Sequence, residues 1–219
     1  MRHVLPLLFS GVLMAQGAPV QSVTTGTAVD NAWVKVRRLS FAVGQELPVH
    51  EHPEHVVVAI SPVAIEEVRE GGQPTRITMK AGEVRHFPAM KHRVKGLSAE
   101  PMDMVLIELK PGAPATSGLD ATGAQDDPKQ AKVEFSNDHL RILRWAIGPK
   151  GKSTHGHGSH VVVFLTAGHA TVTADGGAPR DLVTQAGDAK WLDSVRHTIV
   201  NLTDTTAEAV TVELRPRAK

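Results

Sequence analysis

Histidines are the residues of this chain whose spacing most clearly indicates chemistry. Four histidines in the first half recur in the second half, each 105 residues further on. In each half two lie two positions apart, a third follows three positions later, and the fourth comes 37 residues beyond it. A cluster written twice predicts two metal sites. The candidate ligands are His50, His52, His55 and His92 in the first half and His155, His157, His160 and His197 in the second.

The two closest histidines of each cluster fit a β-strand. Side chains at positions i and i+2 of a strand point to one face, so the members of each His-x-His pair project together. Two adjacent imidazoles on the apolar inner face of a barrel are costly unless they are paired or bound to an ion. His92 and His197 belong to later strands that a barrel can bring across, which closes a face of three nitrogens in each half.

The donor types restrict the metal. The chain has no cysteine, so imidazole and carboxylate groups must hold any ion. Such a set predicts a divalent transition metal (Fe, Zn, Cu, Ni or Mn) in preference to Mg or Ca. His160 is the fourth candidate in the second half, whereas Glu54 and His55 are alternatives in the first. Glu54 has the right parity if the strand continues, and His55 is favoured if Pro53 turns the chain.

The 105-residue register extends well beyond the histidines. It carries Gly71-Gly72 onto Gly176-Gly177 and Glu108-Leu109 onto Glu213-Leu214 without a gap. An internal duplication of this length predicts two similar domains.

Each half has the pattern of an all-β domain. Residues 56–60 and 161–165 are short, continuous apolar runs typical of buried strands, and other segments alternate apolar with polar residues. We expect about eight short strands in each half, the number of a jelly roll. The segment 111–132 is rich in Gly, Ala, Asp, Pro and Thr and is interpreted as a linker between domains at 18–110 and 133–219.

The N-terminus and the charge balance concern location and partners. Arg2 precedes an apolar run, and small residues follow at Ala15 and Gly17, which is the layout of a signal peptide spanning residues 1–17. We therefore expect a periplasmic or secreted protein without a membrane anchor after cleavage. The net charge of +1 argues against a nucleic-acid partner. A small-molecule ligand or substrate is expected, with a monomer or small homo-oligomer.

The motifs resemble those of the cupin superfamily. Gly44 is followed by five residues and then His50-Glu51-His52, and Gly82 is followed by five residues, Pro88 and then His92. The second half repeats the pattern with Gly187 and His197, so the chain resembles a bicupin. His55 and His160 stand where the family usually has glutamate, and Asp193 replaces the proline of the second motif.

The resemblance implies two tandem double-stranded β-helix barrels with a metal in each. Similar cupins include Fe-dependent dioxygenases with three-histidine sites, which bind an oxygen-rich substrate and O₂ at open positions. The hypothesis is therefore a dioxygenase-like oxidoreductase, with catalytic residues beyond the metal ligands not assigned. The alternative is a metal- or small-ligand-binding cupin without turnover, which a saturated four-histidine site would favour.

Overall fold

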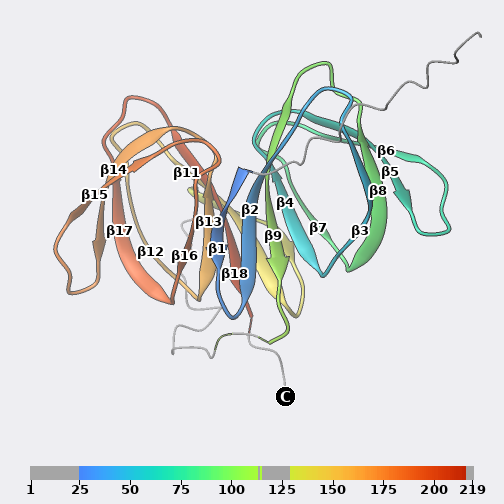
Figure 1. Ribbon diagram of the computed structural model, residues 1–219. Coiled ribbons are helices and arrows are strands. Elements are labelled where there is room, and N and C mark those ends of the chain that lie inside the picture. The colour runs from blue at the N-terminus through green and yellow to red at the C-terminus, as the bar shows by residue number, and fades with distance from the viewer. Residues whose placement is uncertain (1–24, 113, 115–128, 216–219) are drawn as a thin grey trace, which may run out of the picture.

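The computed structural model describes residues 25–112, 114 and 129–215, so the expected signal peptide and most of the expected linker lie outside the described residues. Within the described part the chain forms strands only, nine in each half rather than about eight (Figure 1). The first barrel comprises β1 Thr25–Asp30, β2 Val34–Phe41, β3 Glu46–His52, β4 His55–Ala59, β5 Val63–Arg69, β6 Thr75–Met79, β7 Val84–Phe87, β8 Met90–Gly96 and β9 Met102–Leu109. The second comprises β10 Ala131–Ser136, β11 Leu140–Ile147, β12 Lys152–His157, β13 His160–Phe164, β14 Gly168–Ala174, β15 Arg180–Thr184, β16 Ala189–Leu192, β17 Val195–Asn201 and β18 Ala207–Leu214.

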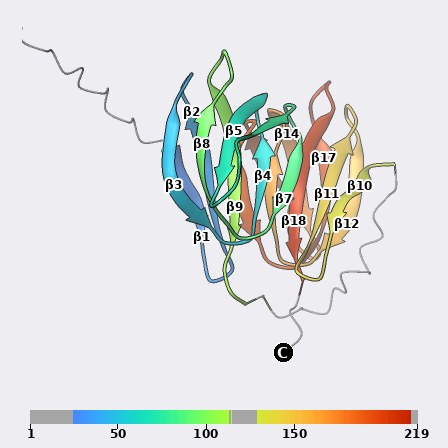
Figure 2. The same ribbon diagram turned by 90° about the vertical axis from the view of Figure 1, so that its right-hand side faces the viewer.

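The two halves have the same topology, as the duplication predicts. The first contains sheets of order β1-β2-β9-β4-β7 and β3-β8-β5-β6, and the second contains β10-β11-β18-β13-β16 and β12-β17-β14-β15. Adding nine to each strand number of the first half gives the second, and every pairing is antiparallel (Figures 1 and 2). The expected all-β architecture of two tandem barrels is therefore confirmed.

Within the five-stranded sheets, the inner strands β4, β9, β13 and β18 are largely buried on both faces, which explains their continuous apolar runs. Val56 and Val58 are fully buried, and they pack in one apolar cluster with Val161 and Val163 of the other half. Val57, which points to the opposite face, lines the interior of its own barrel instead. Each half contributes seven matched positions to this shared cluster: Val34, Val36, Val56, Val58, Val105, Ile107 and Leu109, with Leu140, Ile142, Val161, Val163, Val210, Val212 and Leu214.

A bulge in β3 marks where the repeat register changes. Leu47 pairs with Val94 and His50 with His92, so two residues of β3 stand against one of β8. The equivalent strand β12 pairs with β17 without interruption. The first repeat therefore has one additional residue at this point. Before the bulge, equivalent residues of the two halves are 106 positions apart: Val34 pairs with Leu109, and its equivalent Leu140 pairs with Leu214.

No helix of the described residues is long and apolar enough to cross a membrane.

Candidate metal centres

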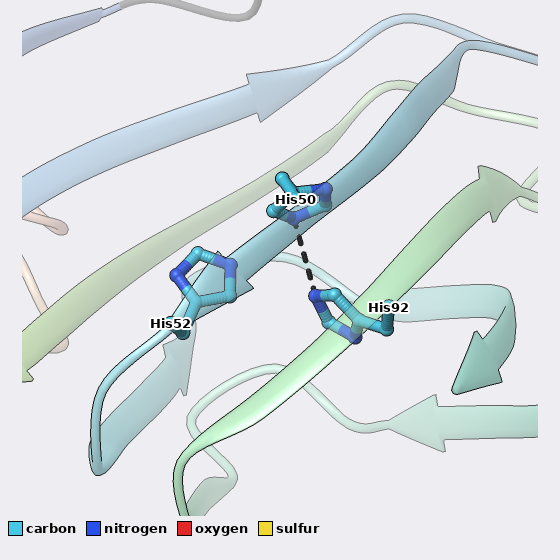
Figure 3. A group of neighbouring side chains, drawn as sticks. All are labelled: His50, His52 and His92. Atoms are coloured by element: carbon cyan, nitrogen blue, oxygen red, sulfur yellow. Dashed lines mark hydrogen bonds between the residues drawn. The ribbon is translucent and has the colours of Figure 1, made fainter. Parts of the chain in front are cut away.

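The strand register brings three of the four predicted histidines of each half together. In the first barrel His50 of β3 lies directly opposite His92 of β8, with His52 two positions along β3. In the second barrel His155 of β12 lies opposite His197 of β17 in the same way, with His157 two positions along β12. One ring nitrogen from each histidine of a triad lies within 4.8 Å of those of the other two. Figure 3 shows the first triad, with the ring of His50 on β3 facing that of His92 on β8.

Hydrogen bonds fix the tautomers of the first triad. The Nδ1 atom of His50 lies 2.7 Å from the carbonyl oxygen of Pro48, and Nδ1 of His92 lies 2.7 Å from Oε1 of Glu67. The carbonyl and the carboxylate oxygens are hydrogen-bond acceptors. In a neutral imidazole each Nδ1 that faces them therefore carries the proton, and each Nε2 carries a lone pair. The two Nε2 atoms nevertheless lie 3.1 Å apart. Two lone pairs at that distance repel unless a cation or a shared proton lies with them.

The spacing of these nitrogens fits a shared transition-metal ion. Ligands about 2.0–2.2 Å from one ion, at the angles of tetrahedral or octahedral sites, place their nitrogens about 2.8–3.6 Å apart. The Nε2 separations of 3.1 Å between His50 and His92 and 3.0 Å between His155 and His197 fall in that range. One pair of nitrogens in each triad therefore already has the spacing of a shared ion, and the third donor, from His52 or His157, lies within 4.8 Å of that pair. The assignment of the triads as ligands remains a prediction.

The second triad is the more deeply buried. His155, His157 and His197 are all buried, whereas His50 and His52 are partly exposed. Burial lowers the pKa of His155 to about 2 and that of His157 to about 3, with the neighbouring imidazoles acting in the same direction. Burial also lowers the pKa of His197. These imidazoles are therefore neutral at pH 7, as metal ligation requires.

Carboxylates behind the histidines are candidate functional residues that the sequence analysis did not identify. Oε1 of Glu108 accepts from Nδ1 of His52 at 2.7 Å, and Oε1 of Glu213 accepts from Nδ1 of His157 at 2.9 Å. Such partners orient a ligating imidazole and increase its basicity. The signal was available, because both glutamates recur at the 105-residue offset, but it was interpreted only as a matching pair of strands.

Arginines stabilise the ionised form of these carboxylates. Arg37 contacts Oε1 of Glu108 at 3.0 Å. The pKa of Glu108 is lowered: burial acts to raise it, but the hydrogen bond from His52 and the charge of Arg37 outweigh that effect. In the second barrel Nε of Arg141 donates to Glu213 at 2.9 Å. Burial there is greater and raises the pKa of Glu213, with Arg141 opposing it.

Two features distinguish the centres. Glu67, which holds His92, has Val172 as its counterpart in the second barrel, so the first triad has one more carboxylate. In the second barrel the indole of Trp145 stacks on the ring of His155, with centroids 4.0 Å apart. The Nδ1 atom of His155 contacts the Ser153 hydroxyl at 2.8 Å.

The fourth histidine of each half lies beside its triad on the opposite sheet. The ring centroids of His55 and His52 are 4.9 Å apart, and those of His160 and His157 are 4.4 Å apart. Nδ1 of His55 donates to the Pro53 carbonyl at 2.8 Å, and burial lowers its pKa to about 4. His160 donates likewise to Gly158, and burial lowers its pKa to about 3. Both line the barrel interior, and their role as fourth ligands stays a prediction.

Glu54, the alternative fourth ligand, makes its hydrogen bonds between the two barrels. Oε1 lies 2.8 Å from Nε2 of His86, and Oε2 lies 2.6 Å from Nδ1 of His139 in the second half. The amide of Asn137 donates to Oε1 at 3.3 Å. Both carboxylate oxygens are thus engaged with residues outside the first triad.

Each triad opens into a cavity with largely apolar walls. The cavity of the first barrel has a volume of about 400 Å³ and that of the second about 700 Å³. Both are within the size range of small-molecule sites. Phe41 and Leu47 contribute to the first, and Ile147, Phe164 and Leu182 to the second.

No protein-family model and no curated protein sequence matches this chain. Solved structures match its fold. A cupin 2 conserved barrel domain protein from Leptotrichia buccalis is 12% identical with a TM-score of 0.58, covering 91% of this chain and 92% of that one. Oxalate decarboxylase from Bacillus subtilis, described for its Mn(II) centres, is 12% identical with a TM-score of 0.57, covering 86% and 70%.

Salicylate 1,2-dioxygenase from Pseudoaminobacter salicylatoxidans, solved with gentisate adducts, is 14% identical with a TM-score of 0.58, covering 85% of this chain and 68% of that one. At these identities the likeness concerns the fold alone. The chain is thus similar in fold to cupin proteins that include dioxygenases and decarboxylases. Its two-barrel architecture is similar to that of bicupins, and its two histidine triads could hold metal ions.

Proposed function

We propose that the protein is a metal-dependent bicupin with dioxygenase-type activity on a small, oxygen-rich organic substrate. The observation that carries this proposal is the triad of converging imidazoles at the wall of an apolar cavity in each barrel. Three protein ligands leave coordination positions open, as catalytic sites require. A bound divalent ion would there supply a Lewis acid able to engage two substrate oxygens or O₂.

The residues of the chain would prepare this site in three ways. Glu108 and Glu213 hold the Nδ1–H tautomer of His52 and His157, so that Nε2 is available to the ion. The apolar walls exclude water and accommodate a hydrocarbon body. His55 and His160 each donate Nδ1–H to a backbone carbonyl, which leaves Nε2 as an acceptor for a proton or for the ion.

The second barrel is the stronger candidate for turnover. Its cavity is the larger of the two, and its triad is fully buried. Trp145 closes one side of that triad by stacking on His155. A ring-sized substrate would fit about 700 Å³ more readily than the 400 Å³ of the first barrel.

The alternative is metal or ligand binding without turnover. It is favoured by the nearness of His160 to His157, because a fourth imidazole would reduce the number of open positions on the ion. We also propose export to the periplasm or the cell exterior, on the basis of the N-terminal sequence alone.

Metal analysis of the purified protein, followed by O₂-uptake assays, tests the proposal. Apo-protein would be loaded anaerobically with Fe(II), Mn(II), Cu(II), Ni(II) or Zn(II) and supplied with small hydroxylated carboxylic acids. The expected result is substrate-dependent O₂ uptake that His197→Ala abolishes, whereas Val183→Ala, at an exposed position outside the cavity lining, retains it. Metal binding without uptake would support the non-catalytic alternative, and absence of metal binding would contradict both.

A further inference from the structure

The three triad histidines of each barrel occupy three corners of a two-by-two arrangement of cross-strand neighbours. In the first barrel His50 faces His92, and His52 faces Met90. In the second barrel His155 faces His197, and the partner of His157 is Val195. The fourth corner is therefore a thioether in the first barrel and an isopropyl group in the second.

The register places Met90 within reach of the first triad. Met90 and His92 are two positions apart on β8, so their side chains share a face. Residues directly opposite in antiparallel strands have Cβ atoms about 4.5–5.5 Å apart, a distance that the unbranched methionine side chain can span. Met90 also lines the same cavity as His50, His52 and His92.

We propose that the thioether of Met90 is the fourth donor of the first centre, and that this set of three imidazoles and one sulfur selects copper, in particular Cu(I). Thioether sulfur is a soft ligand that suits Cu(I), whereas a purely imidazole set accepts several divalent ions. The second centre, with Val195 at the same corner, lacks the sulfur. The two barrels thus hold chemically different ions. This inference rests on the proposed function, since it assumes that the triad binds metal.

The other candidates for the fourth ligand position are less suitable than Met90, because each is engaged elsewhere or lies on the opposite sheet. Both oxygens of Glu54 are engaged with His86 and His139. His55 lies on the opposite sheet and stacks on Phe87 with ring centroids 5.3 Å apart. Glu67 and Glu108 lie near the triad, but they already accept from ligand Nδ1 atoms.

The wider cavity shows the same difference in composition. All four methionines of the described residues lie in the first half: Met79, Met90, Met102 and Met104. Three of them line the first cavity, and the equivalent residues Thr184, Val195 and Ala209 line the second. A thioether-rich environment is thus confined to the barrel in which Met90 occupies the fourth corner.

A pair of exchanged variants tests the proposal. Met90→Val gives the first centre the residue of the second, and Val195→Met does the reverse. Cu(I) affinity would be measured by competition with bicinchoninate, and Co(II) binding by its visible spectrum, on the full chain. We expect two binding sites in the unmodified protein, of which the tighter for Cu(I) is weakened on the order of tenfold or more by Met90→Val. Co(II) affinity should stay unchanged, and Val195→Met should strengthen Cu(I) binding at the weaker site.

X-ray absorption at the copper edge supplies a readout that a merely structural role of Met90 would not change. The protein carrying one equivalent of Cu(I) should show a sulfur scatterer, and Met90→Val should lack it. Equal Cu(I) affinities in Met90→Val and unmodified protein, or an all-nitrogen copper shell, would overturn the inference while Co(II) binding still supported the triads. Failure to bind either ion would instead overturn the proposed function.

Discussion

Trp145 and His155 form the closest ring stack at either centre, with centroids 4.0 Å apart and planes inclined by 22°. The indole nitrogen of Trp145 also donates to the hydroxyl of Thr211 at 3.1 Å. The indole therefore links the metal-facing strand β12 to the five-stranded sheet of the second barrel. In the first barrel the equivalent position is Leu39, at the 106-residue offset that applies before the β3 bulge.

Replacement of Trp145 by Leu should destabilise the protein and loosen the second centre. Loss of a buried indole costs about 3 kcal/mol in the free energy of unfolding, because the surrounding groups fill the cavity only in part. Chemical denaturation measures this change. Trp145→Phe, which keeps a ring against His155, should cost less. Equal stability of the Leu variant and the unmodified protein would contradict a packing role for Trp145.

Replacement of Glu67 by Gln should weaken metal binding at the first centre. Its carboxylate accepts from Nδ1 of His92 at 2.7 Å and from Nε of Arg69 at 2.8 Å. Loss of such a partner lowers metal affinity by about 10–100-fold. Isothermal titration with Co(II) would measure the change. Glu66→Gln, on the other face of β5, is the matched control and should leave the affinity unaltered; equal effects of the two substitutions would argue against Glu67.

The metal-free protein should lose stability in mild acid. Burial lowers the pKa of His155 to about 2 and those of His157 and His160 to about 3, from an unfolded value of 6.5. Below pH 6.5 the unfolded chain therefore binds protons that the folded barrel does not, so the free energy of unfolding falls as the pH drops. The lowered pKa of Glu108 acts in the same direction below pH 4.5.

Urea denaturation of chelator-treated protein at a series of pH values between 7 and 3 checks this expectation. The raised pKa of Glu213 works in the opposite sense above pH 4.5, because its folded form then gives up its proton less readily than the unfolded chain does. A midpoint that stays constant from pH 6.5 to 4 would contradict the buried, neutral state of the second triad.

The two barrels should unfold together. Val58 is fully buried in the cluster that both halves share, so Val58→Ala should lower the free energy of unfolding of the whole molecule by about 2 kcal/mol. Differential scanning calorimetry should show one transition that moves as a unit. Two separate transitions, with only one shifted by Val58→Ala, would show that the interface does not couple the halves. Val43→Ala, at an exposed site, is the control.

The barrels and most residues of the candidate centres could be predicted from the sequence, because both depend on local periodicity. The i, i+2 spacing of His50 and His52 determines their common face, and the repeat supplied the matching strands. Each half has nine strands where about eight were expected, and the edge strands β1 and β10 have weak apolar patterns that make them hard to count from sequence.

Residues that act through tertiary contacts were not predictable in this way. Glu67 lies on the strand after the Val-Val-Val segment, and only the pairing of β5 with β8 places it behind His92. Glu54 was considered as a ligand because it has the strand parity of His50 and His52. Its contact with His139 depends instead on how the two barrels pack, which strand periodicity does not encode.

The matched valine and leucine positions between the barrels have an evolutionary consequence. Because the same face of each repeat contributes to the contact, a single ancestral repeat could have paired with an identical copy through it, as symmetric homodimers do. In such a homodimer any substitution would alter both sites at once. Fusion into one chain removes that constraint, and differences such as Met90 against Val195, Glu67 against Val172 and Trp145 against Leu39 can then accumulate at one site while the other keeps its original chemistry.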